Sequence, residues 1–174
     1  MTDFLLELLS EEIPARMQAK ARSDLEKLFA DQLAAAGLKA ESLQTFSTPR
    51  RLALIARGLP ETTEAVSEEL KGPPADAPDA AVEGFLRKAG LTRDALETRE
   101  VKGRATLFAV IDKPGRATAD VLSDAIPAIV RAFPWPKSMR WGAASQTTES
   151  LRWVRPLQGI IALLGGYVVP CEVD

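Results

Sequence analysis

A long amphipathic segment limits the folds open to this sequence more than any other feature. Between residues 13 and 33 apolar side chains recur at three- and four-residue spacings, the pattern of a helix with one buried face. Pro14 suits the first turn of this helix, and Gly37 suits the position just after its end. We predict a helix from about Ala15 to Ala36. Its apolar stripe comprises Ile13, Met17, Ala21, Leu25, Leu28, Phe29 and Leu33.

Short strands and two further helices surround this segment in the sequence. The apolar or alternating runs predict strands at 4–9, 43–46, 51–57, 97–101, 105–112, 160–164 and 167–173. Helices are predicted at 80–89, with Asp79 as N-cap and Gly90 after its end, and at 118–133, where Pro127 should kink or interrupt the helix. Strands and helices do not alternate regularly. The expected fold class is therefore α+β, a mixed or antiparallel sheet with packed helices.

The stretch from 60 to 80 has no clear periodicity. It combines acidic residues with Pro73, Pro74 and Pro78, a composition typical of an exposed connection or an ordered loop. We place a sub-boundary of the chain within this connection.

Composition excludes several kinds of chemistry. The 174 residues contain no histidine and one cysteine, Cys171. Imidazole-based nucleophilic catalysis, zinc sites built on imidazole, an internal disulfide and multi-thiolate metal sites are therefore absent. Asp3 and Glu7 occupy the place of a basic secretory n-region, and the longest apolar stretch, 160–171, is too short to span a bilayer. We expect a cytoplasmic chain without a catalytic group or metal site of its own.

Charge is distributed unevenly along the chain. Residues 1–100 carry 13 basic and 18 acidic groups, whereas residues 101–174 carry 9 basic and 6 acidic groups. The basic excess could face an anionic partner, but a solvated mixed surface explains it as well. The neighbouring acids Glu11 and Glu12 precede the long helix. There they are expected to supply oxygens near its start, where the helix dipole stabilises carboxylates.

Two consecutive arginines, Arg50 and Arg51, stand at the entrance of a predicted strand. Consecutive strand residues point to opposite faces, so one guanidinium can meet solvent or a phosphate while the other pairs inward. Pairing with a carboxylate from the Glu11–Glu12 turn and contact with RNA both remain open here.

Aromatic and basic residues are mixed in the segment 133–142. Lys137, Arg140 and Trp141 lie there, and Arg155 follows in a second basic–aromatic segment, 152–156. Aromatic side chains beside basic groups can stack bases and hold phosphates. The same residues can cover a core, with cation–π contact between arginine and indole.

Several segments, taken in order, carry a resemblance to a known family. They are Phe4–Pro14, Phe46–Ala53, Lys71–Pro73, Gly84–Leu91, Pro134–Gly142, Val154–Pro156 and Ile160–Gly165. Together they resemble the β subunit of the bacterial heterotetrameric glycyl-tRNA synthetase. One departure is Gln158-Gly159, where the family is expected to have a His-Trp pair.

The resemblance implies that residues 1–174 are an N-terminal piece of a longer β subunit of glycine–tRNA ligase. It implies that ATP- and Mg²⁺-dependent glycine activation belongs to the α subunit, and that the β subunit binds and positions tRNA(Gly). The fragment itself should be inactive and hold no cofactor. Its expected partners are the α subunit, tRNA(Gly) and the remainder of the β subunit, with no membrane and no DNA. Arg50, Arg51, Lys137, Arg140, Trp141 and Arg155 are the candidate contacts to RNA or to a subunit.

Two other functions stay open. An editing-like hydrolase would need Glu11, Glu12, Thr48 or Ser138 in one pocket with backbone donors for an oxyanion. A purely architectural piece would instead dock apolar faces onto the α subunit or the rest of β, and an exposed apolar patch would favour it.

Overall fold

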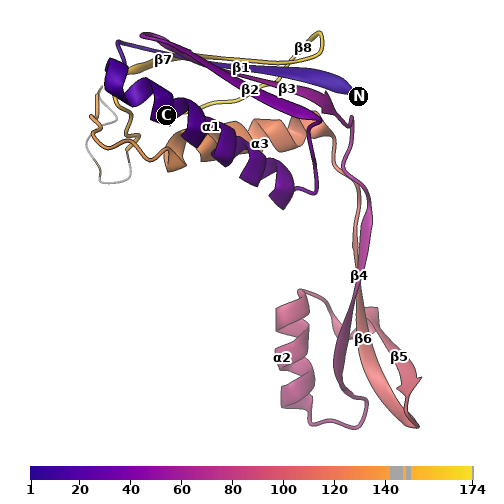
Figure 1. Ribbon diagram of the computed structural model, residues 1–174. Helices are drawn as coiled ribbons and strands as arrows, with labels where there is room; N and C mark the ends of the chain where they lie inside the picture. Colours follow the sequence, from indigo (N-terminus) through magenta and orange to yellow (C-terminus); the bar gives the residue numbers. More distant parts are fainter. Residues whose placement is uncertain (142–146, 148–149, 174) are drawn as a thin grey trace. The chain divides into compact units, whose positions relative to one another are not determined.

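The computed structural model describes residues 1–141, 147 and 150–173 and divides into two compact units (Figure 1). Unit 1 comprises Met1–Thr63 and Arg116–Asp174, and unit 2 comprises Glu64–Gly115. Unit 1 contains helices on a five-stranded sheet, and unit 2 contains a three-stranded sheet with a helix. All strand pairs are antiparallel, which confirms the predicted α+β class.

Unit 1 has its helices α1 and α3 on one face of the sheet, as Figure 1 shows. The sheet has the strand order β2-β3-β1-β7-β8. The elements are β1 (Thr2–Ser10), α1 (Ala15–Ala35), β2 (Ser42–Thr48), β3 (Arg51–Leu59), α3 (Thr118–Ala132), β7 (Leu157–Leu164) and β8 (Tyr167–Val168). The predicted last strand, 167–173, is therefore shorter than expected and ends at Val168.

The core of unit 1 lies between this sheet and the two helices. Alternate residues of β1, including Phe4, Leu6 and Leu8, are buried, as are the α1 positions of the predicted stripe except the half-buried Leu28. Phe4 and Phe29 stack with ring centroids 5.6 Å apart. The alternate residues of the strand and the helix residues spaced three and four apart therefore pack in one core.

Both ends of α1 lie within one residue of the predicted bounds, because the helix runs from Ala15 to Ala35. Gly37 adopts a positive φ of 74°, and the Leu38 amide donates to the Leu33 carbonyl, an arrangement that closes the last turn. At the N-terminus only the details were wrong. Pro14 is the cap residue rather than part of the first turn, and no side chain caps the helix, so the expected carboxylate oxygens of Glu11 and Glu12 do not serve there.

Helix α3 continues through Pro127, so of the two predicted outcomes, a kink or an interruption, the interruption was wrong. A proline inside a helix removes one hydrogen bond and costs about 3 kcal/mol. The helix buries an almost continuous apolar face that includes Leu122, Ile126 and Ile129. Burial of side chains of this size stabilises by about 1.5–3 kcal/mol each, which offsets the loss.

The two chain segments of unit 1 that flank unit 2 are tied together. Thr62 and Ala117 form an antiparallel bridge, and the Thr63 amide donates to the Arg116 carbonyl at 2.8 Å. The Arg116 amide in turn donates to the Thr63 hydroxyl at 2.7 Å. Next to them, the fully buried Thr118 hydroxyl donates to the Pro60 carbonyl.

Thr118→Val is expected to lower the free energy of unfolding by about 1–3 kcal/mol, because it removes the donor to a partly buried carbonyl at nearly constant volume. Urea denaturation of the two proteins measures this loss. Thr48→Val removes an exposed hydroxyl on β2 and should change stability by less than about 0.5 kcal/mol. Equal effects of the two substitutions would show that the Thr118 hydrogen bond contributes nothing.

Unit 2 is built around an antiparallel hairpin, which was predicted. Its sheet has the order β4-β6-β5. The elements are β4 (Val66–Pro74), α2 (Asp79–Ala89), a 3₁₀ turn (Arg93–Ala95), β5 (Leu96–Val101) and β6 (Arg104–Lys113). Lys102 and Gly103 both have positive φ at the turn between β5 and β6, which is the geometry of the tight hairpin turns that fit twisted strands.

Strand β4 lies where the sequence predicted a loop, and this prediction was wrong. β4 is an edge strand with most of its residues exposed, so its side chains show no apolar alternation. Of the three prolines that suggested a loop, Pro73 and Pro74 stand at its end and Pro78 follows it before α2. Charged residues and a terminal proline are typical of protected edge strands as well as of loops.

The cap prediction for α2 was half wrong. Gly90 has a φ of 67° and ends the helix as predicted. Asp79, however, is the first helical residue and caps nothing with its side chain. Its carboxylate instead accepts from Arg93 at 3.3 Å.

An arginine bridges the sheet of unit 2 from strand to strand. The Arg99 guanidinium donates to Glu97 at 2.8 Å, pairs with Glu69 at 2.9 Å and lies over the Phe108 ring. The hydrogen bonds that Arg99 donates to Glu97 and Glu69 raise the pKa of Arg99 above its ordinary value. Within the described residues of either unit, no helix is long and apolar enough to cross a membrane.

Candidate functional site

Three segments that are distant in sequence meet where β1 ends. The Ser10 amide donates to the Arg50 carbonyl at 3.0 Å, and the Glu11 amide donates to the Pro156 carbonyl at 3.0 Å. The Ile13 amide donates to the Pro49 carbonyl at 2.6 Å. The turn between β1 and α1 is therefore fixed between the β2–β3 turn and the segment that enters β7.

A polar cavity of about 400 Å³ opens at this junction. We call it the Arg50–Arg155 pocket. Its lining consists of Ser10, Glu11, Glu12, Arg50, Arg155 and Gln158. Each of the three segments contributes to it, because the antiparallel pairing of β1 with β3 and with β7 brings their ends to the same edge.

The charged groups of the pocket have few intramolecular partners. Arg50 and Arg155 are exposed, and neither side chain forms an ion pair or hydrogen bond with a residue that the structure describes. The same holds, over residues 1–141, 147 and 150–173, for the Glu11 and Glu12 carboxylates. Guanidinium groups present a planar fork of donors that matches phosphate and carboxylate oxygens. The pocket thus offers donors and acceptors side by side.

Arg51 has a different environment from Arg50. Its guanidinium forms an ion pair with Glu7 on the neighbouring strand at 3.5 Å. The sequence predicted opposite directions for the two arginines and left their roles open. Arg51 is the paired one, but with Glu7 rather than with the Glu11–Glu12 turn.

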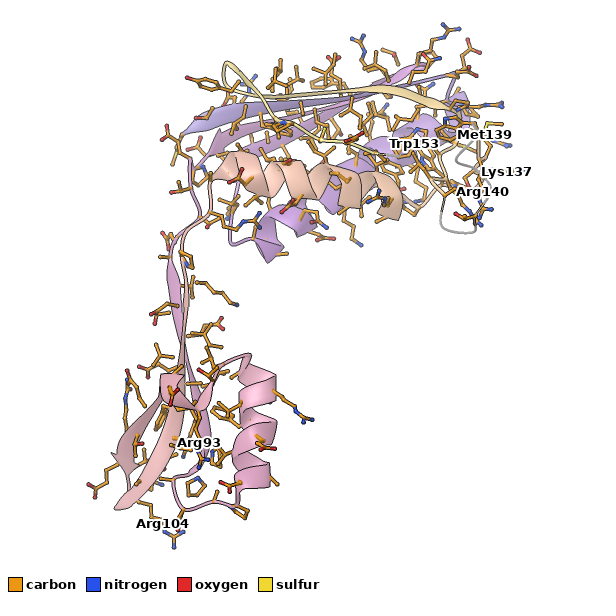
Figure 2. All side chains as sticks on the ribbon, turned by 180° about the vertical axis from the view of Figure 1, so that it is seen from behind. Arg93, Arg104, Lys137, Met139, Arg140 and Trp153 are labelled. Atoms are coloured by element: carbon orange, nitrogen blue, oxygen red, sulfur yellow. The ribbon has the colours of Figure 1, made fainter. Side chains whose placement is uncertain are left out.

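The predicted basic–aromatic segment lies at one end of unit 1. In Figure 2, Lys137, Met139 and Arg140 are grouped there, close to Trp153. Met139 and Trp153 exchange two backbone hydrogen bonds, with N···O distances of 2.8 and 3.3 Å. This pairing brings the Lys137 segment beside the chain that leads to Arg155.

The basic residues of this segment differ in exposure. Lys137 is exposed, and the described residues give its ammonium no partner. Arg140 and Trp141 are half-buried and both already interact with other residues. The Lys137 side chain is therefore more accessible than that of Arg140. Gly142, the last residue of the segment that carried the resemblance, lies outside the described residues.

Tryptophans near this end pack into the core. Phe133, Trp135 and Trp153 form a cluster with centroid distances of 4.6–5.0 Å, and Trp153 is fully buried. The sequence left base stacking and core packing open for this region. These three rings act as core. Among described residues, the indole N–H groups of Trp135 and Trp153 have no acceptor.

Some residues of this end were not singled out by the sequence. Arg16 and Lys20 in the first turns of α1 line a small crevice of about 50 Å³ with Trp135 and Pro136. Nothing in the local sequence distinguishes them, since isolated basic residues on a helix are ordinary solvent-facing groups. Arg16 and Lys20 are identified only by the structure, in which Trp135 and Pro136 lie beside them on α1.

The structure does not bring together in one pocket the residues that the hydrolase hypothesis needs. Glu11 and Glu12 line the Arg50–Arg155 pocket, but Thr48 and Ser138 are absent from its lining. Within the described residues, no group of three or more acidic or thiol side chains could hold a metal ion.

Known proteins of one family match the chain over nearly its whole length. The family model for the glycyl-tRNA synthetase beta subunit matches residues 4–174. The chain is 57% identical to the glycine–tRNA ligase beta subunit of Cereibacter sphaeroides, 55% to that of Phenylobacterium zucineum and 54% to that of Paracoccus denitrificans. Each match covers 100% of this chain and 25% of the relative.

These relatives are named as subunits of an aminoacyl-tRNA synthetase. The chain belongs to the glycyl-tRNA synthetase beta subunit family. It spans a quarter of the length of the curated relatives that it matches.

Proposed function

We propose that this chain is the part of a glycine–tRNA ligase β subunit that helps to hold tRNA(Gly), and that the Arg50–Arg155 pocket contacts its backbone. In this proposal the α subunit carries the ATP- and Mg²⁺-dependent activation of glycine. The α subunit, tRNA(Gly) and the remainder of β are the partners, and the setting is the cytoplasm. The names of the relatives support the identity of the complex.

The observation that carries the proposal is the pair Arg50 and Arg155. Both guanidinium groups line one pocket, and the described structure leaves them without a carboxylate partner. An arginine that serves only the fold usually has a hydrogen-bonding or ionic partner, or lies isolated on the surface. Two arginines brought together by separate strands are suited to phosphate oxygens.

The neighbouring carboxylates limit how an anion can approach. Glu11 and Glu12 line the same pocket and repel phosphate. A phosphodiester would therefore have to sit on the arginine side. Exposed Lys137, at the end of unit 1 shown in Figure 2, could add a further phosphate contact.

The test is tRNA binding by the full-length β subunit in complex with α. Arg50→Gln/Arg155→Gln should weaken tRNA binding roughly 10- to 100-fold at about 0.1 M salt, because two phosphate contacts are lost. The slope of log K against log salt should become less steep by about two. Fluorescence anisotropy with labelled tRNA at several salt concentrations measures both quantities.

Arg104→Gln is the control, because Arg104 is an exposed arginine of unit 2 and lies outside the pocket. It should leave the affinity within about twofold, as expected for an exposed residue without a phosphate contact. If the double variant keeps both the wild-type affinity and the wild-type salt slope, the pocket does not contact RNA. The melting temperature of each variant, measured alongside, shows whether an affinity loss comes from unfolding.

A further inference from the structure

The sheet of unit 1 has a second face that none of the described helices covers. Both α1 and α3 pack on the face formed by residues such as Leu6, Leu54 and Ala162 (Figure 1). We call the opposite face the outer face. Strand register assigns to it Leu5, Glu7 and Leu9 of β1, Gln44 and Phe46 of β2, Arg51, Ala53, Ile55 and Arg57 of β3, Ile161 and Leu163 of β7, and Val168 of β8.

Two rows of side chains cross this outer face, one of them interrupted by Glu7 and the other apolar from β3 to β8. In one row Phe46 stands opposite Ala53, Ala53 opposite Glu7, and Glu7 opposite Ile161. In the next row Ile55, Leu5, Leu163 and Val168 are successive neighbours. Neighbouring strands lie roughly 4.8 Å apart, a spacing at which side chains opposite one another on the same face can pack together. We call these apolar side chains the patch.

Exposure on this face is high for side chains of this kind. Phe46 is 51% exposed, Ile161 39% and Val168 74%. A sheet with one solvated face normally alternates apolar residues toward the core and polar residues toward water. Here β7 carries Ile161 and Leu163 on the outer face, and β1 carries Leu5 and Leu9 there beside Glu7. Apolar residues on both faces are the pattern of strands covered on both sides.

Charge at the centre of the patch is balanced within the sheet. Glu7 is only 18% exposed at its side chain and pairs with Arg51 at 3.5 Å. The pair leaves little free positive charge in the middle of the face. A phosphate backbone needs unpaired cations, so the outer face suits a protein surface rather than RNA.

We propose that in the full-length subunit the outer face binds a later segment of the same β chain. The match accounts for 25% of each relative, so about three quarters of their sequence is available as the occupant. A segment of the same chain reaches the face at a high effective concentration, which favours it over a separate subunit. This interface is independent of the RNA contact proposed above.

The test measures how accessible the outer face is in the full-length β subunit purified without α. Phe46→Cys and Ile161→Cys each place a thiol on the patch, and maleimide labelling is read by mass spectrometry on the peptide that carries it. Lys27→Cys, at an exposed position of α1, is the control. Burial raises the pKa of the Cys171 thiol, and labelling of Cys171 is followed separately on its own peptide.

Labelling of the two outer-face thiols should be at least about 100-fold slower in the native subunit than in denaturant, while the control is slowed less than about 10-fold. Rapid labelling of both thiols in β alone overturns the proposal, whether the face becomes protected on adding α or stays open in the complex. Protection that disappears on dilution overturns it in favour of a second copy.

A second measurement needs no substitution and so does not depend on the folding of a variant. Hydroxyl-radical footprinting of the wild-type β subunit alone should give Phe46 an oxidation rate about tenfold or more below that of the unfolded chain. A rate near the unfolded value, with 51% of the side chain exposed as in the structure, would contradict the proposal.

Discussion

Replacing Phe29 with alanine is expected to lower the free energy of unfolding of unit 1 by about 3–5 kcal/mol. Phe29 is fully buried in the middle of α1 and stacks on Phe4 of the central strand β1. The substitution removes the ring and leaves a cavity between helix and sheet, which the surrounding rigid core cannot fill. Urea denaturation followed by circular dichroism measures the loss as a lower midpoint with an unchanged m-value.

Lys27→Ala is the control for this prediction, because Lys27 is exposed on the same helix. It should change stability by less than about 0.5 kcal/mol. A loss below about 1 kcal/mol for Phe29→Ala would mean that α1 does not cover β1 as described.

Replacing Gly72 with valine is expected to destabilise unit 2 by on the order of 3 kcal/mol. A Cβ at this position would lie 2.6 Å from the Phe85 ring and 2.9 Å from the Leu107 carbonyl oxygen. The ring could shift, but the carbonyl belongs to the central strand β6 and cannot move without disturbing the sheet. A small unit has little stability to lose, so it should open selectively.

Hydrogen–deuterium exchange measures this opening, with amides of β4 and β6 exchanging faster while those of β1 and β3 are unchanged. Gly84→Ala is the matched control within the same unit. Gly84 lies inside α2 with open space around its Cβ position, so alanine there should stabilise the helix by about 0.5–1 kcal/mol. Faster exchange in β1 would show instead that the two units unfold together.

Strong periodicity made part of the fold predictable. The α1 stripe, the β1 run and the β5–β6 hairpin are each defined by side chains close in sequence, and the structure has all three. β4 could not be predicted in the same way. Its partner strand β6 is separated from it in the sequence by α2 and β5. The exposed residues of β4 do not alternate between apolar and polar.

The candidate site was predictable in its members but not in its geometry. Arg50 and Arg155 stand out in sequence as basic residues in distinctive segments. Their presence in one pocket depends on β1 pairing with both β3 and β7, which no local pattern specifies. The Arg51–Glu7 ion pair depends equally on register, because a shift by one residue would turn both side chains to the opposite face.

The bridge between Thr62 and Ala117 has a consequence for the architecture of the chain. It closes unit 1 at the point where the polypeptide leaves and returns, and the Thr63–Arg116 hydrogen bonds complete the closure. Every strand of the five-stranded sheet has its neighbours from within unit 1. Residues 64–115 are thus a topological insertion: a short turn between Thr63 and Arg116 could replace them without removing a single rung of that sheet.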